Sequence, residues 1–242
     1  MPGLGEEVLG RLREAGADEL RALVRGLGET LDLPAAQAVL RNPHAGEEVV
    51  RLLAAERRLL ASYEMRRDLA LHAATPQPTA LALVSALYWR DLVAAGLDMR
   101  IRPVVRRFAD QRLIDRLPGL AVGEKATVAR SASPHVLQTL RHDPTPRVIA
   151  ALLDNPRLVE GDLLPVAGGE KAPAPVLAVI LGHRKWGNRY PVRLAVVRNP
   201  RAPLALALQH LALLKKPDLR AVAADRRLAL PLRRKAELLL GG

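Results

Sequence analysis

Hydrophobic residues along the chain come in short runs, and prolines separate the runs. The segment Val192–Leu219 shows this pattern most clearly. Its first apolar run predicts a short helix, which must end before Pro200 because Asn199 precedes a proline and is disfavoured in the α-helical conformation. Pro203 suits the first turn of a second helix, where its missing N–H would have no partner. Asp218 is expected to cap a third helix.

The same helix–break–helix unit recurs along the chain. Residues 69–83 match residues 194–208 at a constant offset of 125, and residues 147–157 match residues 191–201 at an offset of 44. An earlier copy surrounds Asn42. Recurrence of one such unit is the signature of a stacked array, in which each repeat buries its apolar face against its neighbours. The sequence therefore predicts an all-α fold, a right-handed α-solenoid of short helical repeats.

Two segments are expected along the chain. Residues 1–33 carry seven acidic residues and four arginines and are predicted to form an acidic N-terminal helical cap. A terminal repeat needs a polar outer face, which an acidic cap would supply. Residues 34–242 are predicted to form one continuous repeat array, with Gly168-Gly169 as the only candidate hinge.

The Asn-Pro breaks, the helices that begin with Asp-Leu and the uneven repeat length resemble HEAT-like repeats, especially those of the leucine-rich repeat variant type. The resemblance covers roughly residues 34–240. It implies a binding surface and not a reaction, because a fold alone does not fix a function. Some members of that family hold an iron–sulfur centre with an N-terminal cysteine cluster, and this chain has no cysteine to form one.

Composition narrows the possibilities further. Aromatic residues make up only 2% of the chain and hydrophobic residues 49%, so the core must consist of Leu, Ala and Val, which favours closely packed helices over sheets. The absence of cysteine excludes disulfides, thiolate metal sites and a cysteine nucleophile within these residues. No uncharged apolar run approaches the ~20 residues that span a bilayer, and residues 1–10 do not resemble a secretory signal. We expect a cytoplasmic protein that does not enter a membrane.

Residues able to carry catalysis or to hold a cofactor are scattered. The six histidines do not fall at metal-ligand spacing, so no metal is predicted. The glycine-rich segment 168–171 lacks the spacing of a phosphate-binding loop, so no cofactor is expected either. No serine lies in a nucleophile elbow, and no pair of carboxylates stands out as acid and base. Trp89 with Asp91 leaves a base-flipping DNA glycosylase as a third possibility, because such enzymes need an aromatic wall and a carboxylate.

The clearest chemical feature is the net charge of +12, which gathers in basic clusters outside the acidic N-terminal segment. A basic surface attracts acidic partners. Trp186 adds a possible stacking ring to one of these clusters. The candidate partner-binding residues are Arg100, Arg102, Arg106, Arg107, Arg184, Lys185, Trp186, Arg189, Arg198, Arg201, Lys215, Lys216, Arg233 and Arg234.

These features predict a non-catalytic scaffold that engages an acidic macromolecular partner, with another protein as the first choice. The alternative is sequence-tolerant binding of duplex DNA or RNA through phosphate contacts. A simpler interpretation is that the arginines only solvate helix faces. The deciding fact is whether the basic residues share one side of the molecule. The Asn199 side chain is expected to tie down backbone groups at its break, so that Asn199→Ala lowers stability.

Overall fold

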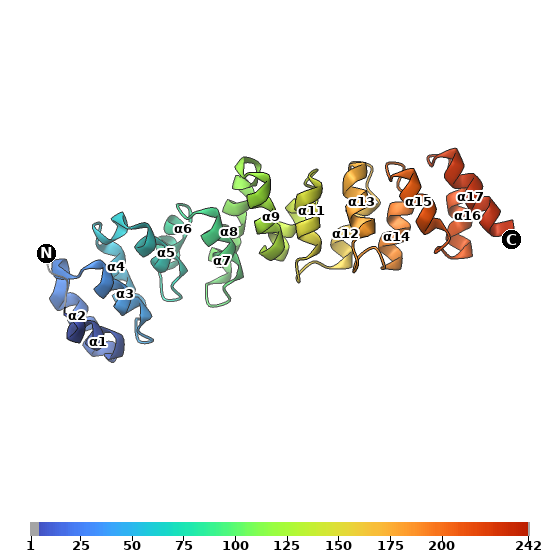
Figure 1. Cartoon of the computed structure of the whole chain (residues 1–242). Coiled ribbons are helices and arrows are strands. Elements are labelled where there is room, and N and C mark those ends of the chain that lie inside the picture. Colours follow the sequence, from blue (N-terminus) through green and yellow to red (C-terminus); the bar gives the residue numbers. More distant parts are fainter. Residues whose placement is uncertain (1–4, 242) are drawn as a thin grey trace. The chain divides into compact units, whose positions relative to one another are not determined.

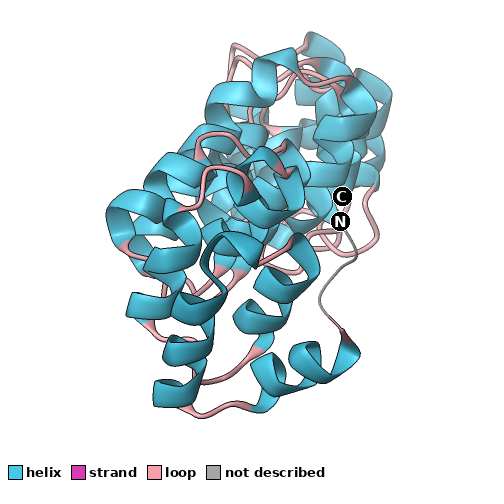
Figure 2. Cartoon of the chain, turned by 90° about the vertical axis from the view of Figure 1, so that its left-hand side faces the viewer, coloured by secondary structure: helices cyan, strands magenta, loops and turns pink. Residues whose placement is uncertain are grey.

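The structure is a computed structural model that describes residues 5–241. Within these residues all regular secondary structure is helical, with seventeen α-helices, three short 3₁₀-helices and no strand (Figures 1 and 2). The prediction of an all-α fold is therefore confirmed. The nineteen prolines contribute to this pattern because several of them stand at or just before the first turn of a helix.

The chain divides into two compact units, Met1–Arg116 and Leu117–Gly242. The division after Arg116 was not predicted. The first two helices, which correspond to the predicted cap, pack against the next two helices inside the first unit. The predicted hinge at Gly168-Gly169 lies inside the second unit.

Helices of the first unit pack on helices one or two positions away in the chain, and α5 lies against α6. Thus α1 lies against α3 and α3 against α5, while α2 lies against α4. The unit ends in a hairpin of α7 and α8, which pack on each other. The bounds are α1 (Glu6–Glu14), α2 (Ala17–Leu27), η1 (Gly28–Thr30), α3 (Leu33–Arg41), α4 (Glu47–Ala55), η2 (Leu59–Ala61), α5 (Tyr63–Leu71), α6 (Gln77–Val84), α7 (Trp89–Leu97) and α8 (Pro103–Arg116).

The second unit is built in the same way. The helices α9, α11 and α13 lie side by side in that order, α12 lies against α14, and α16 and α17 form a terminal hairpin (Figure 1). The bounds are η3 (Leu117–Gly119), α9 (Val122–Ser131), α10 (Pro134–Leu140), α11 (Pro146–Leu153), α12 (Glu160–Ala167), α13 (Ala174–Gly182), α14 (Tyr190–Val197), α15 (Leu204–Leu211), α16 (Lys216–Ala224) and α17 (Leu230–Gly241).

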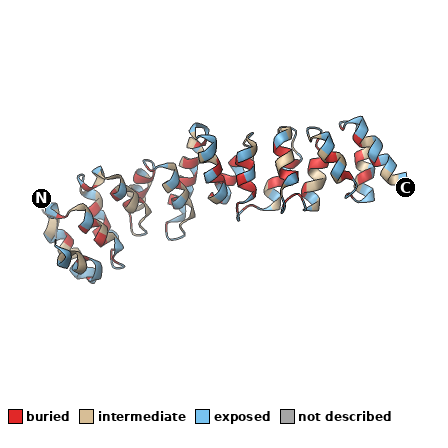
Figure 3. Ribbon diagram, viewed as in Figure 1, coloured by how far each residue is buried: buried red, intermediate tan, exposed pale blue. Residues whose placement is uncertain are grey.

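Leucine, alanine and valine fill the space between the helices of each unit. The buried apolar residues are nearly all of these three types, and Trp186 is the one aromatic among the buried residues that the structure describes. In Figure 3 the buried positions face neighbouring helices and the exposed positions form the outer surfaces of each unit. Small side chains let the helices approach closely, which is how a core with few aromatics can reach the density of a protein interior.

Buried asparagines hold helix ends together at the Asn-Pro breaks. Asn42, Asn155 and Asn199 follow α3, α11 and α14, and each is at most 2% exposed. Each Oδ1 accepts the backbone N–H two residues further on. Each Nδ2 donates, over 2.8–3.2 Å, to two carbonyls at the end of the helix two positions earlier, which are those of Leu12 and Ala15, of Ala129 and Ala132, and of Ala167 and Gly169. The expectation that Asn199 ties down backbone groups is confirmed.

Histidines take this position at two other helix ends. His72 follows α5 and His183 follows α13, and the Nδ1 atom of each accepts the N–H two residues further on, at 3.2 and 3.3 Å. Beside His183, the indole Nε1 of Trp186 donates to the Leu153 carbonyl at the end of α11, at 2.8 Å. Because Trp186 satisfies a carbonyl that has no partner within α11, it joins α13 to α11 as the asparagines join other helix pairs.

Both units end in the same module. The helices α5 to α8 and the helices α14 to α17 begin at positions that differ by 127 in all four pairs. The predicted offset of 125 between residues 69–83 and 194–208 is therefore wrong by two residues. Alternating Leu and Ala fit more than one register, and the helix starts decide between them.

The predicted helix caps around α15 and α16 also need correction. Lys215, and not Asp218, precedes the first residue of α16, and Pro203 precedes α15 instead of standing in its first turn. The Asp218 carboxylate instead accepts a hydrogen bond from the Tyr190 hydroxyl. Asp91 and Tyr63 make the same bond in the first unit.

Candidate partner-binding surface

Nearly all of the net charge belongs to the second unit. The first unit contains 17 Lys and Arg against 16 Asp and Glu, a net charge of +1. The second unit contains 20 Lys and Arg against nine Asp and Glu, a net charge of +11. A surface for an acidic partner should therefore be sought on the second unit.

Loops of the second unit that are two helices apart lie beside one another. The bonds from Asn155 to Ala129 and Ala132 place the α11–α12 loop beside the α9–α10 loop. The bond from Trp186 to Leu153 places the α13–α14 loop beside the α11–α12 loop. These contacts arise because α11 lies against α9 and α13 lies against α11, so that the ends of these helices coincide.

A tyrosine continues this edge to the α15–α16 loop. The Tyr190 hydroxyl accepts the backbone N–H of Lys215 at 3.0 Å and donates to Asp218. The Lys215 ammonium lies 5.0 Å from the centre of the Tyr190 ring, within the range of a cation–π contact. Burial and the bond to Asp218 raise the pKa of Tyr190, so the hydroxyl keeps its proton at neutral pH. Tyr190 thus fixes the position of Lys215.

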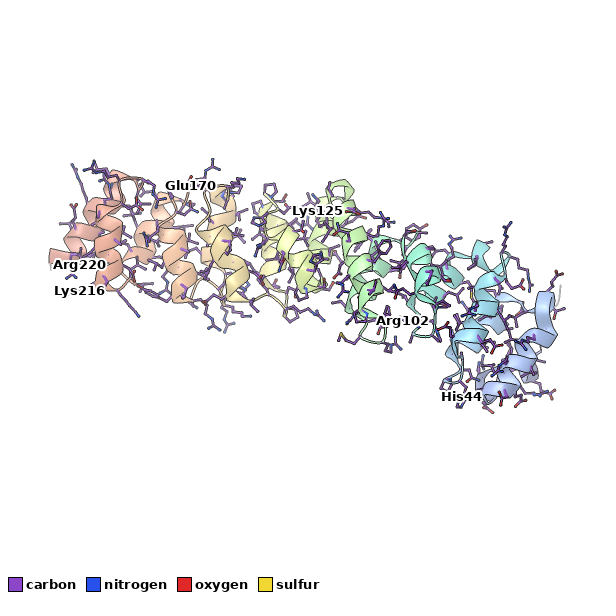
Figure 4. All side chains as sticks on the ribbon, turned by 180° about the vertical axis from the view of Figure 1, so that it is seen from behind. His44, Arg102, Lys125, Glu170, Lys216 and Arg220 are labelled. Atoms are coloured by element: carbon purple, nitrogen blue, oxygen red, sulfur yellow. The ribbon has the colours of Figure 1, made fainter. Side chains whose placement is uncertain are left out.

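Three of these neighbouring loops and the adjoining start of α16 carry exposed basic residues. We name this set the basic loop edge, and it consists of Arg157, Arg184, Lys185, Arg189, Lys215 and Lys216. Ion pairs of the described part of the second unit use Lys125, Arg141, His183 and Arg227, and none uses a member of this set. Figure 4 shows Lys216 at one margin of the second unit and Lys125 and Glu170 at the opposite margin.

Few acidic side chains neutralise the basic loop edge. Asp154 stands 3.3 Å from the His183 ring, and Asp218 is engaged by Tyr190. Two large apolar residues lie exposed on the same loops, Val159 with 59% and Leu213 with 54% of its surface accessible. The edge therefore combines unpaired positive charge with exposed apolar side chains.

The structure brings together five of the predicted partner-binding residues and separates the others. Arg184, Lys185, Arg189, Lys215 and Lys216 lie on the basic loop edge. Arg198 and Arg201 lie beyond the other end of α14, and Arg233 and Arg234 belong to α17. Because Asn199 binds the Gly169 carbonyl, its loop lies beside Glu170, on the margin opposite Lys216 (Figure 4).

Three of the four predicted arginines of the first unit have acidic or other partners. Arg100 forms an ion pair with Asp98 at 2.7 Å, and this pairing lowers the pKa of Asp98. Arg102 lies 3.5 Å from Glu47. Arg106 donates to the sulfur of Met99. Arg107 is exposed and forms no ion pair with a described residue.

Trp186 is not available for stacking on a partner, and its prediction as a binding residue is wrong. Its side chain is buried, with 3% of the residue exposed, and its N–H is already used. The Lys185 ammonium lies 4.2 Å from its ring centre and covers that face. From sequence alone, an aromatic ring beside basic residues fits a stacking platform and a core position equally well. The helix end after α13 has no asparagine to bind the end of α11, and Trp186 makes that bond instead.

Sequence reasoning missed Arg157. The repeat pattern offered a signal for it. A basic or histidine residue follows Asn-Pro in all three copies, as His44, Arg157 and Arg201, and the structure shows each of them exposed. The N–H of this residue binds the asparagine Oδ1, so its side chain must point away from the break.

No metal-binding cluster emerges within residues 5–241. No group of three or more His, Asp or Glu side chains in this range could hold a metal ion. No helix among the same residues is long and apolar enough to span a membrane. Asp91, the carboxylate considered for base flipping, accepts a hydrogen bond from Tyr63, as Asp218 does from Tyr190.

No protein-family model, curated protein or solved structure matches this chain.

Proposed function

We propose that this protein is a non-catalytic helical-repeat scaffold whose basic loop edge binds an acidic surface of another protein. The observation that carries this proposal is the row of six exposed Lys and Arg residues without ion pairs among described residues, on neighbouring loops of one edge. Uncompensated charge on a rigid edge steers an oppositely charged partner and fixes its register.

We further propose that the repeats form right-handed α-solenoids of the HEAT-like, leucine-rich repeat variant type. Stacking of α9, α11 and α13, and of α12 and α14, supports this architecture. So do the asparagine bonds between helices two positions apart. An array of this kind offers an extended surface that partners use for binding.

A protein partner would use both the basic and the exposed apolar residues of the basic loop edge, whereas a nucleic acid would use only the basic ones. Phosphate contacts would use the arginines and lysines but would leave Val159 and Leu213 exposed, whereas protein interfaces combine apolar contacts with a charged rim. Trp186, the only tryptophan near the edge, is buried and cannot stack on a base. Duplex binding therefore becomes the alternative outcome of the test.

The test is fluorescence anisotropy of a labelled peptide of Glu, Asp and Leu, beside a labelled DNA duplex. One substitution on each of two loops and one at the start of α16, Arg157→Glu, Arg184→Glu and Lys216→Glu together, should weaken peptide binding by roughly tenfold or more, because three attractive pairs become repulsive. The matched control is Arg41→Glu, Arg57→Glu and Arg107→Glu in the first unit, three exposed arginines without ion pairs to described residues. It changes the net charge equally and should alter binding little.

Two results would contradict the proposal. Equal weakening by both triple variants would mean that binding follows net charge and not the basic loop edge. Tighter binding of the duplex than of the peptide would favour the nucleic-acid alternative, provided that the duplex affinity falls steeply between about 50 and about 200 mM salt.

A further inference from the structure

A second candidate site lies on the margin of the second unit opposite the basic loop edge. A cavity of about 640 Å³ opens there between the α10–α11 loop and the α12–α13 loop. Glu170, which lies on its lining, marks this margin in Figure 4. The floor is apolar and includes Val166, Ala172 and Val176. A volume of this size and an apolar lining are typical of small-ligand sites.

The wall formed by the α12–α13 loop is held in place. The Asn199 amide binds the Gly169 carbonyl at 2.9 Å. A side chain on Gly169 would approach the Pro165 carbonyl oxygen to 2.5 Å, so only glycine permits this close contact. The cavity is therefore defined by the fold before any ligand arrives.

Acidic side chains at the cavity are neutralised from outside it. Asp143 pairs with Lys125 at 3.5 Å, and Glu170 pairs with Arg227 at 3.5 Å. Neither of these two cations belongs to the cavity lining. Neither acid therefore pairs with Arg141 or Lys171, the two cations of the lining.

Three side chains of the lining carry positive charge or can donate a hydrogen bond, and they are Arg141, His142 and Lys171. Arg141 forms a long ion pair with Asp162 at 3.7 Å, and its Nε donates to the His142 ring at 3.2 Å. Lys171 is exposed and forms no ion pair with a described residue. Arg141, His142 and Lys171 all line the cavity, and burial, then the charges of Arg141 and Lys171, lower the pKa of His142.

We propose that this cavity binds a carboxylate carried on an apolar body. The carboxylate would meet Arg141 and Lys171, whose charge-assisted hydrogen bonds are the strong ones, and the apolar body would cover Val166 and Ala172. Two sources share this chemistry: a free aliphatic acid and the C-terminus of a peptide that ends in apolar residues. The proposal does not depend on the function of the basic loop edge.

Isothermal titration calorimetry of the full chain tests it with two probes, octanoate and acetyl-Leu-Leu with a free carboxylate. Each probe has an uncharged twin, octanamide and the peptide amide. We expect at least one acid to bind and its amide twin to bind about tenfold more weakly. Binding of octanoate alone would identify a free acid as the ligand type, and binding of the peptide alone would identify a C-terminus.

A matched pair of variants locates the site. Lys171→Glu should weaken binding of the acid about tenfold, while Lys235→Glu, an equal change at an exposed lysine of α17, should leave it unchanged. Methyl NMR signals of Val166 and Val176 in the unmodified chain should shift on titration. The proposal is overturned if neither acid binds, if the amides bind equally well, if Lys171→Glu binds like the unmodified chain, or if those methyl signals stay unmoved.

Discussion

The last four helices of each unit share a framework and differ in charge. Residues 63–113 contain eight Lys and Arg against five acids, whereas residues 190–240 contain eleven against three. The shared positions are those with structural contacts, such as Tyr63 and Tyr190 with their aspartates. From the first module to the second, the number of bases rises by three and the number of acids falls by two, so both changes make the second module more positive.

The same comparison distinguishes arginines that form ion pairs within the chain from arginines that are open to a partner. Asp98 with Arg100 and Asp225 with Arg227 form matching ion pairs at 2.7 and 2.8 Å, at the loop before the last helix of each unit. These arginines belong to the framework. Arginines of the basic loop edge have no such pairs with described residues, so they remain open to an external acid.

The largest effect is expected from the buried asparagines. Asn42→Ala and Asn199→Ala each leave two carbonyls and one N–H without their partner, which should cost about 2–4 kcal/mol of unfolding free energy. Urea unfolding checks this in both units. The control is Asn188→Ala, whose amide bond to Arg184 is exposed and should matter little. An unchanged melting temperature for Asn199→Ala would break the claim that the two units share this device.

Smaller and equal losses are expected from Tyr63→Phe and Tyr190→Phe, about 1 kcal/mol each for a lost hydroxyl bond. Burial and the aspartate partner raise the pKa of both hydroxyls. A raised pKa means that the unfolded state releases its proton first, so this stability is present below about pH 10 and is lost as pH rises further. Unfolding free energies measured from pH 8 to pH 11 should fall less in the Phe variants, and a fall as steep as in the unmodified chain would contradict this.

The smallest effect on stability is expected from Asp98→Asn and Asp225→Asn. Arg100 and Arg227 hold the pKa of these carboxyls below the usual value, so their contribution is present above about pH 4 and is lost as pH falls through the folded pKa. Both arginines are exposed, which limits the gain. Acid-unfolding curves of the two variants should be shifted slightly and equally. Unequal shifts would show that the two pairs are not equivalent.

Asp98→Asn also sharpens the comparison of charges. Freeing Arg100 makes the first unit more like the second, so the first unit should gain weak affinity for the acidic peptide in the anisotropy assay. The corresponding change at Asp225 adds free charge to a margin away from the basic loop edge and should alter peptide binding less. A larger gain from Asp225→Asn would place the binding surface elsewhere.

The sequence was sufficient for the helical class and for the breaks, because Asn-Pro and Pro positions end and start helices by local stereochemistry alone. It was also sufficient for the role of Asn199. It failed on the register of residues 69–83, where Leu and Ala alternate and several alignments look alike. It also failed on Trp186, because burial of a ring depends on the carbonyl of Leu153, which is distant in sequence.

The sequence also contained enough information to predict which basic clusters lie on the same edge. Two loops with two helices between them lie on the same edge. Two loops with one helix between them lie at opposite ends of that helix. Once the helices around Arg189, Arg198 and Lys215 are counted, this rule places Arg189 with Lys215 and excludes Arg198. Helix counts were the missing information, and they follow from the breaks. The division after Arg116 coincides with Pro118, Gly119 and Gly123, but proline and glycine stand at many other breaks of this chain, so they do not single out this one.

Hydrogen–deuterium exchange of the full chain, with and without the peptide of Glu, Asp and Leu, tests the central claim most directly. The account predicts slower exchange in residues 154–159, 183–189 and 212–216 of the second unit. It predicts no change in the corresponding loops of the first unit, residues 28–32, 56–62 and 85–88. Equal protection in both units, or protection confined to residues 198–203 and 225–229, would contradict it.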